Sequence, residues 1–161
     1  MADNEPIENE EIAEEERLAS PPDASKESIE LKAYNLINQT LCGYIEDVKD
    51  GYAKTRFIAI DEMAVDRRGL IHSGHIFSAA NFAAIAAVNK PNAILAAARC
   101  NFLAPLKVGD EVVFEANSMQ SSTRKRTVTV VGTIGKIKAF DGEFAVVITE
   151  RHVLSLNILE A

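Results

Sequence analysis

Apolar and polar positions alternate with different periods in different parts of the chain. The large apolar residues of segment 26–38 lie near one stripe with a period of 3.6, which predicts a short amphipathic helix. Two β-rich segments, 41–48 and 52–60, flank an Asp-Gly turn and predict a β-hairpin. Residues 76–88 are apolar at almost every position, so they predict a helix that is buried on most of its circumference.

Further strands are predicted after this apolar helix. They cover 92–104, 111–120, 126–137 and 143–156, with turn signals at Ser121–Ser122 and Asp141–Gly142. The order of elements is a helix, a hairpin, a long apolar helix and four strands, which predicts an α+β domain. An antiparallel sheet that curls around the long central helix would bury it, and the many alanines of the helix would let the sheet approach closely.

Charge is spread unevenly along the 161 residues, whose formal net charge is -7. Residues 1–30 hold 11 acidic side chains against Arg17 and Lys26, whereas the rest of the chain is slightly basic. We expect residues 1–24 to form a disordered acidic tail and residues 25–161 to form a single domain. The tail would serve as a solubilising leader or, alternatively, as a partner-docking segment.

Targeting and redox features predict a cytoplasmic protein. The first residues lack the basic and apolar regions of a signal peptide, and the segment 76–88 is too short to span a membrane. Cys42 and Cys100 lie in predicted strands without a nearby Cys or His at metal-ligand spacing, so we expect buried, reduced thiols and no metal site.

Three motifs resemble those of one enzyme superfamily. GLIHSGHIFSAAN is similar to the histidine-glycine-glycine segment that opens the central helix of hotdog acyl-CoA thioesterases. APLKVGDEV resembles their turn between strands, and SSTRKRTVTV resembles their basic turn. Within the superfamily, GHIFSAANFAAIAAV is most similar to the ligand domain of the malonyl-CoA-sensing repressor of fatty-acid synthesis. The resemblance implies a hotdog fold, a homodimer or higher oligomer, and a CoA thioester bound between subunits without a further cofactor.

The start of the central helix is the first candidate site. Hydrolysis or tight binding of a thioester needs donors for its carbonyl oxygen, and the free N–H groups of Ser73, Gly74 and His75 lie at the positive end of the helix dipole. Phe77, which the resemblance shares, is expected to contact the ligand. Alternatively, Gly74 only eases the turn into the helix.

Asn81 departs from the resemblance, which implies a catalytic carboxylate seven positions after Gly74. An amide can orient a water molecule or a carbonyl group, but it cannot take a proton. Asn81 would bond a ligand, water or backbone or, equally, a neighbouring strand. His72, His75, Glu62 and Asp66 are candidate bases near the helix start, although each histidine could instead be a cap or a core contact.

The basic cluster Arg124, Lys125 and Arg126 would hold CoA phosphates or, alternatively, form an ordinary solvated turn. We expect no nucleic-acid or membrane partner, because the cluster lacks stacking aromatics and the tail would repel phosphates. The sequence thus predicts an acyl-CoA-binding sensor or accessory protein of fatty-acid metabolism. A slow acyl-CoA thioesterase using Asn81 with His72, Glu62 or Asp66 is an alternative, as is an interaction module with a vestigial pocket. Open space at the helix start would argue against that module.

Overall fold

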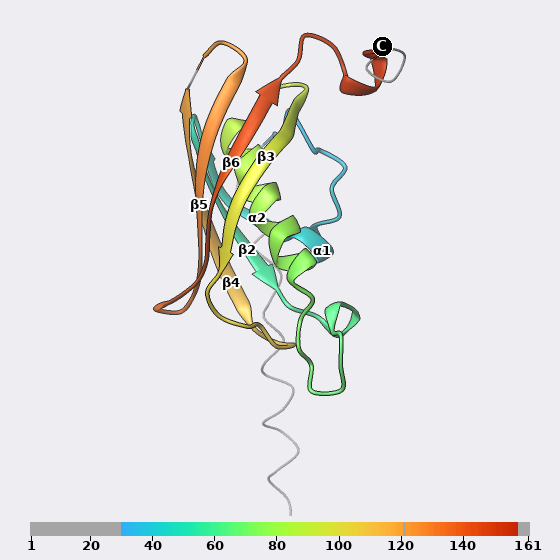
Figure 1. The fold of residues 1–161 in the computed structure, drawn as a ribbon, viewed down its shortest axis with the longest axis vertical. Coiled ribbons are helices and arrows are strands. Elements are labelled where there is room, and N and C mark those ends of the chain that lie inside the picture. The colour runs from blue at the N-terminus through green and yellow to red at the C-terminus, as the bar shows by residue number, and fades with distance from the viewer. Residues whose placement is uncertain (1–29, 121, 158–161) are drawn as a thin grey trace, which may run out of the picture.

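The fold is one antiparallel sheet wrapped around one long helix (Figure 1). The computed structural model describes residues 30–120 and 122–157. The helices are α1 (Gln39–Cys42) and α2 (Ser73–Val88), with 3₁₀ turns η2 (Asp61–Met63) and η3 (Val153–Ser155). The strands are β1 (Tyr44–Lys49), β2 (Tyr52–Ile58), β3 (Ala93–Phe102), β4 (Glu111–Gln120), β5 (Lys125–Ile134) and β6 (Ile137–Ile148), in the sheet order β1-β2-β4-β5-β6-β3. The predicted α+β hotdog architecture is confirmed, whereas the predicted tail lies outside the described residues.

The α2 helix occupies the core because most of its side chains are small and apolar. Its last two-thirds, from Ala79 to Val88, is buried except at Asn81. The inner faces of the strands supply large side chains opposite these alanines, including Phe57, Phe114, Phe140 and Phe144. A large side chain on the sheet thus fills the space that a small one on the helix leaves, as a close-packed core requires. The helix is closed by Asn89, which adopts the left-handed conformation and donates its N–H to the Ile85 carbonyl.

The N-terminal segment differs from the prediction. Residues 30–38 form turns rather than an amphipathic helix, and Tyr34 has a positive φ of 55°. The reason is tertiary: Asn89 Oδ1 accepts a hydrogen bond from the Lys32 N–H (2.8 Å), and Asn89 Nδ2 donates one to the Glu30 carbonyl (3.1 Å). These bonds hold the segment against the end of α2, where Leu31 and Tyr34 pack on the core. The apolar residues of this segment therefore reach the core from an irregular backbone, and their helical spacing does not correspond to a helix.

Cys42 was also misplaced by the sequence pattern. It ends the short helix α1, which Asn38 caps by accepting a hydrogen bond from the Leu41 N–H (3.3 Å), and β1 begins only at Tyr44. Cys100 does lie in a strand, β3. Both cysteines are free, but both are half-buried rather than fully buried.

The β5–β6 turn lies earlier than predicted. It forms at Gly135, where φ is 56°, and Asp141–Gly142 lies inside β6. Gly142 is needed there for packing, because a Cβ atom would lie 3.0 Å from the Phe144 ring and 3.1 Å from the Arg99 carbonyl oxygen. The final strand ends at Ile148, and the predicted continuation to residue 156 is replaced by a bend and η3.

Gly132 tests the closeness of packing between the sheet and the aromatic core. A Cβ atom at this position would lie 2.7 Å from Phe114 Cε1 and 3.2 Å from Phe140 Cβ. We expect Gly132→Ala to lower the free energy of unfolding by about 1–3 kcal/mol through overpacking, although alanine is the better strand residue. The conservative change Val131→Thr, at an exposed position of the same strand, should have little effect. Urea unfolding measures the free energy of unfolding of both variants. A Gly132→Ala variant as stable as the wild-type protein would contradict this close packing.

Candidate functional site

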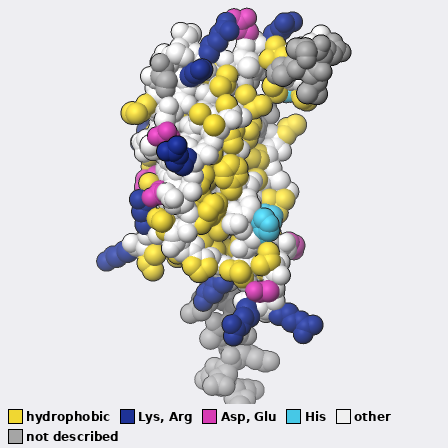
Figure 2. All heavy atoms as spheres, viewed as in Figure 1, with side chains coloured by type: hydrophobic (Ala, Val, Ile, Leu, Met, Phe, Trp, Pro, Cys, Tyr) yellow, Lys and Arg dark blue, Asp and Glu magenta, His cyan; other side chains and the backbone are white. Residues whose placement is uncertain are grey.

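An open groove lies at the start of α2. Its volume is about 500 Å³. It is lined by Val65, Leu70 and Ile71 from the loop before α2, by His72, Ser73 and Ile76 from the helix start, and by Phe102, Ala104, Pro105 and Leu106 from the end of β3 and the following segment. His72 and Ser73 are the polar side chains of this lining. Figure 2 shows hydrophobic side chains gathered in a band along the face on which β3 and α2 lie. The described residues therefore leave open space at this helix start, which argues against an interaction module with a vestigial pocket.

Short backbone links hold the loop that forms one wall of the groove. The Ile71 N–H donates to the Leu106 carbonyl (2.9 Å), and the His72 N–H donates to the Met63 carbonyl (3.0 Å). The carboxylate of Asp66 closes the tip of the loop, because its Oδ1 accepts from the N–H groups of Arg68 (2.9 Å) and Leu70 (3.2 Å). The helix start is thus anchored to two separate parts of the chain. Asp66, a candidate base, is already used in holding this loop.

His72 caps α2 with its own side chain. Its Nδ1 accepts a hydrogen bond from the Gly74 N–H at 2.7 Å, and its carbonyl accepts from the His75 N–H at 3.0 Å. Two of the three predicted thioester donors therefore have partners within the helix start, and the described residues provide no acceptor for the Ser73 N–H. A Cβ atom on Gly74 would lie 2.6 Å from His72 Nδ1, so the glycine is required by this cap. The role of Gly74 toward a ligand stays a prediction.

Asn81 has an unpaired acceptor inside the protein. Its Oδ1 is buried and, within residues 30–120 and 122–157, makes no hydrogen bond. The buried hydroxyl of Thr55 on β2 is in the same state. The alternative that Asn81 bonds a neighbouring strand is therefore not realised through this oxygen. Such unpaired atoms are costly and rare, so Asn81 is a polar position that packing alone does not explain.

Phe77 and Ser78 precede Asn81 by one helical turn on α2. Phe77 is half-buried and stacks on Phe144 of β6, with ring centroids 5.7 Å apart, so it does not line the groove. Ser78 Oγ lies 3.3 Å from Cys42 Sγ of α1. The strand predicted around Cys42 would not bring it to α2, whereas its position at the end of α1 does.

Cys100 does not have the features of an activated nucleophile. Burial, followed by the charge of Asp141, raises the pKa of the Cys100 thiol, which keeps it protonated. Within the described part of the chain, no three His, Cys, Asp or Glu residues are grouped so that they could hold a metal ion. None of its helices is long and apolar enough to cross a membrane.

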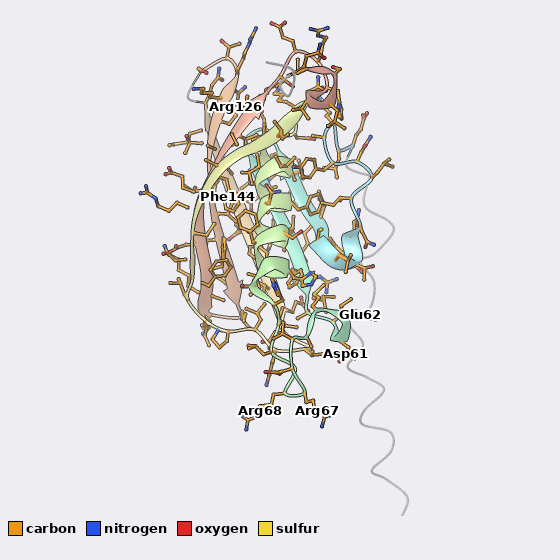
Figure 3. All side chains as sticks on the ribbon, turned by 45° about the vertical axis from the view of Figure 1, so that its right-hand side comes forward. Asp61, Glu62, Arg67, Arg68, Arg126 and Phe144 are labelled. Carbon is orange, nitrogen blue, oxygen red and sulfur yellow. The ribbon has the colours of Figure 1, made fainter. Side chains whose placement is uncertain are left out.

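Within one molecule, the basic turn (Arg124, Lys125 and Arg126) and the groove lie near opposite ends of the α2 helix. Figure 3 shows Arg126 near one end of α2 and Glu62 near the other. The helix is 16 residues long, which corresponds to about 24 Å. Arg124 pairs with Glu150, and Arg126 Nη1 donates to the Ser122 carbonyl (2.8 Å), whereas Lys125 is exposed. The structure thus places Glu62 near the helix start, where it is exposed, but it does not bring the basic turn there.

A second groove, which is polar, lies beside the basic turn. Its volume is about 260 Å³, and its lining includes Arg126, Lys90, Ser118 and Gln120 at the C-terminal end of α2. Lys90 was not selected from the sequence, because it follows the helix as an isolated charge. Strand pairing and the helix end bring it to this groove.

Comparison with known proteins identifies the family. No protein-family model matches the chain. The chain is 40% identical to the crystal structure of Cj0977, a sigma28-regulated virulence protein from Campylobacter jejuni, and the match has a TM-score of 0.74 over 76% of this chain and 95% of that chain. The chain belongs to the hotdog-fold family of Cj0977. PaaI of Escherichia coli, at 19% identity, shares the fold with a TM-score of 0.59 over 64% of this chain and 80% of its own.

Two curated relatives match parts of longer proteins. The chain is 31% identical over 84 residues to the transcription factor FapR of Shouchella clausii, which is 52% of this chain and 44% of FapR. It is 40% identical over 116 residues to a methylthioribose-1-phosphate isomerase of Aquifex aeolicus, which is 72% of this chain and 25% of that protein. The chain therefore spans less than half the length of either relative. The similarity to FapR supports the resemblance of the hotdog chain to a ligand-binding domain.

The cap at the groove can be tested by substitution of His72. His72→Ala removes the acceptor for the Gly74 N–H, so we expect the free energy of unfolding to fall by about 1 kcal/mol. His72→Asn should retain most of the stability, because asparagine is a strong N-cap residue. Urea unfolding of the three proteins distinguishes capping from a general packing role. Equal losses for alanine and asparagine would contradict the cap.

Proposed function

We propose that this protein binds acyl-CoA thioesters as a sensor or accessory protein of fatty-acid metabolism, rather than as an efficient hydrolase. The observation that carries the proposal is the apolar groove that opens onto the polar start of α2. A thioester combines an apolar acyl chain with a carbonyl group that needs a donor, and the groove offers both environments side by side. The relationship to hotdog proteins supports this ligand class.

The carbonyl oxygen of the thioester would meet the first turn of α2. The Ser73 N–H lies at the positive end of the helix, where a partial negative charge is favoured. The Gly74 N–H would become a second donor if the ring of His72 turned away, and His72 is exposed. Binding would then exchange an internal cap for a ligand contact. This exchange costs little, because one acceptor replaces another.

Activation of water is the step that the site lacks. Asn81 occupies the position where the related thioesterases carry a carboxylate, and an amide does not accept a proton at neutral pH. Asp66 is engaged by two backbone N–H groups, and the Glu62 side chain is exposed. The site therefore lacks the carboxylate at position 81, and two of its other candidate bases, Asp66 and the Nδ1 of His72, are already hydrogen-bonded to backbone N–H groups. This supports binding over turnover.

A homodimer formed through β3 would complete the site. β3 is an edge strand of ten residues, and it carries the exposed run Ala96–Ala98 without a proline. Long apolar edges of this kind normally pair with another strand. Two copies related by a two-fold axis would pair their β3 strands antiparallel and continue the sheet from one subunit to the other.

This pairing would bring the basic turn of one copy to the groove of the other. Lys125 pairs with Val147, and Val147 pairs with Ile94 near the start of β3, whereas Phe102 at its other end lines the groove. In an antiparallel pair, the start of one β3 lies beside the end of its partner. The basic turn would then lie three strand spacings, about 15 Å, from the groove of the other subunit. Its cations could hold CoA phosphates while the thioester meets α2.

The central test is Asn81→Asp, which supplies the missing carboxylate with little change in shape. We expect the wild-type protein to be stabilised by acyl-CoA in a thermal-shift assay without releasing free CoA thiol. The variant should hydrolyse the same acyl-CoA at least about tenfold faster than wild type, since general-base catalysis contributes at least this much. Thermal unfolding is measured in parallel, because a buried carboxylate can cost stability.

The matched control is Asn81→Ala, which removes the amide without adding a base. It should not gain hydrolysis. Rapid hydrolysis by wild type that is lost in Asn81→Ala would instead make Asn81 catalytic and favour the thioesterase alternative. An absence of stabilisation by CoA or any acyl-CoA would favour an interaction module and refute the proposed function.

A further inference from the structure

The lining of the groove has a consequence for the kind of acyl group it admits. Its walls carry no lysine, arginine or acidic side chain among the described residues, and its polar members are His72 and Ser73 at one end. Ile76 and Leu106 at its base are buried, whereas Leu70 and Phe102 form exposed apolar rims. The part of the groove beyond the helix start is therefore a neutral apolar surface.

We infer that the groove selects thioesters with uncharged, apolar acyl chains and discriminates against dicarboxylic ones such as malonyl-CoA. This inference rests on the proposed function and deepens it. An acyl chain that lies between Ile76 and Phe102 removes apolar area from water at each added methylene. A terminal carboxylate in the same place would lose hydration without gaining a cation.

The nearest cations do not reverse this preference. An adjoining groove of about 470 Å³ shares Leu70, Pro105 and Leu106 with the first, and its charged members are Arg68, Lys107, Asp66 and Asp110. Two positive and two negative side chains leave it without a net attraction for an anion. Figure 3 shows Arg68 at the tip of its loop, directed away from α2. A carboxylate at the end of a short acyl group would therefore meet a neutral wall.

The central helix resembles that of a malonyl-CoA-sensing repressor, but the helix alone does not determine which acyl group is bound. The helix motif provides contacts for the thioester group, which malonyl-CoA and longer acyl-CoAs have in common. The walls that receive the rest of the acyl group come from the loop before α2 and from the segment after β3. Selectivity can thus differ while the helix motif is retained.

The test is calorimetric titration of the full chain with acetyl-, butyryl-, hexanoyl-, octanoyl- and malonyl-CoA. Affinity should rise from acetyl- to hexanoyl-CoA by about two- to fourfold per methylene. Malonyl-CoA should bind no more tightly than acetyl-CoA. Equal or tighter binding of malonyl-CoA than of hexanoyl-CoA would overturn the inference and leave the proposed function intact. An affinity that does not depend on chain length would also overturn it, whereas no binding of any thioester would refute the proposed function itself.

A variant locates the selectivity in the groove. Leu70→Lys places a cation on an exposed rim, so hexanoyl-CoA affinity should fall about tenfold or more and malonyl-CoA affinity should rise. The matched control is Leu36→Lys in the segment before α1, an exposed position that lines neither groove, which should leave both affinities unchanged. Equal effects of the two substitutions would show that general charge, and not the groove, sets the preference. Circular dichroism verifies that both variants are folded.

Discussion

Burial of α2 within a single sheet is the constraint on which the other features depend. Alanines along the helix let the strands approach closely, and the aromatic side chains of the sheet fill the space between them. As a consequence, the helix is buried from Ala79 to Val88 except at Asn81. His72, Ser73 and Gly74 are left exposed, so backbone donors and the helix dipole are available to a ligand only at this end.

Much of the fold could be predicted, because the strongest signals in the sequence are local. The continuous apolar run corresponds to α2, and the Asp-Gly signal corresponds to the turn between β1 and β2. The failures arise where distant contacts override local patterns. Segment 30–38 has a helical pattern but is held irregular by Asn89, and Gly142 has the signal of a turn but packs against the Arg99 carbonyl of β3. Neither partner can be inferred from neighbouring sequence positions.

The candidate site was predictable in the same uneven way. The motif located the helix start and Asn81, but the expected partner of the Asn81 acceptor is not found within the described structure. It left open whether His72 is a base or a cap, and the structure shows the cap, since the His72 side chain accepts from the Gly74 N–H. The groove was also hidden, because Phe102 and Leu106 reach the helix start only through the strand order. Residues that form walls carry no chemical signature of their own.

The separation of groove and basic turn within one chain makes a two-subunit site the central claim. It can be tested with two variants that are each expected to lose acyl-CoA binding, Gly74→Val and Arg126→Glu. The two variants are mixed, unfolded and refolded together. In a mixed dimer, the intact helix start of one copy would face the intact basic turn of the other, so one of two sites is complete. Since half of randomly formed dimers are mixed, the account predicts that roughly a quarter of the wild-type hexanoyl-CoA sites return. No recovery, with mixed dimers present by native mass spectrometry, would contradict it.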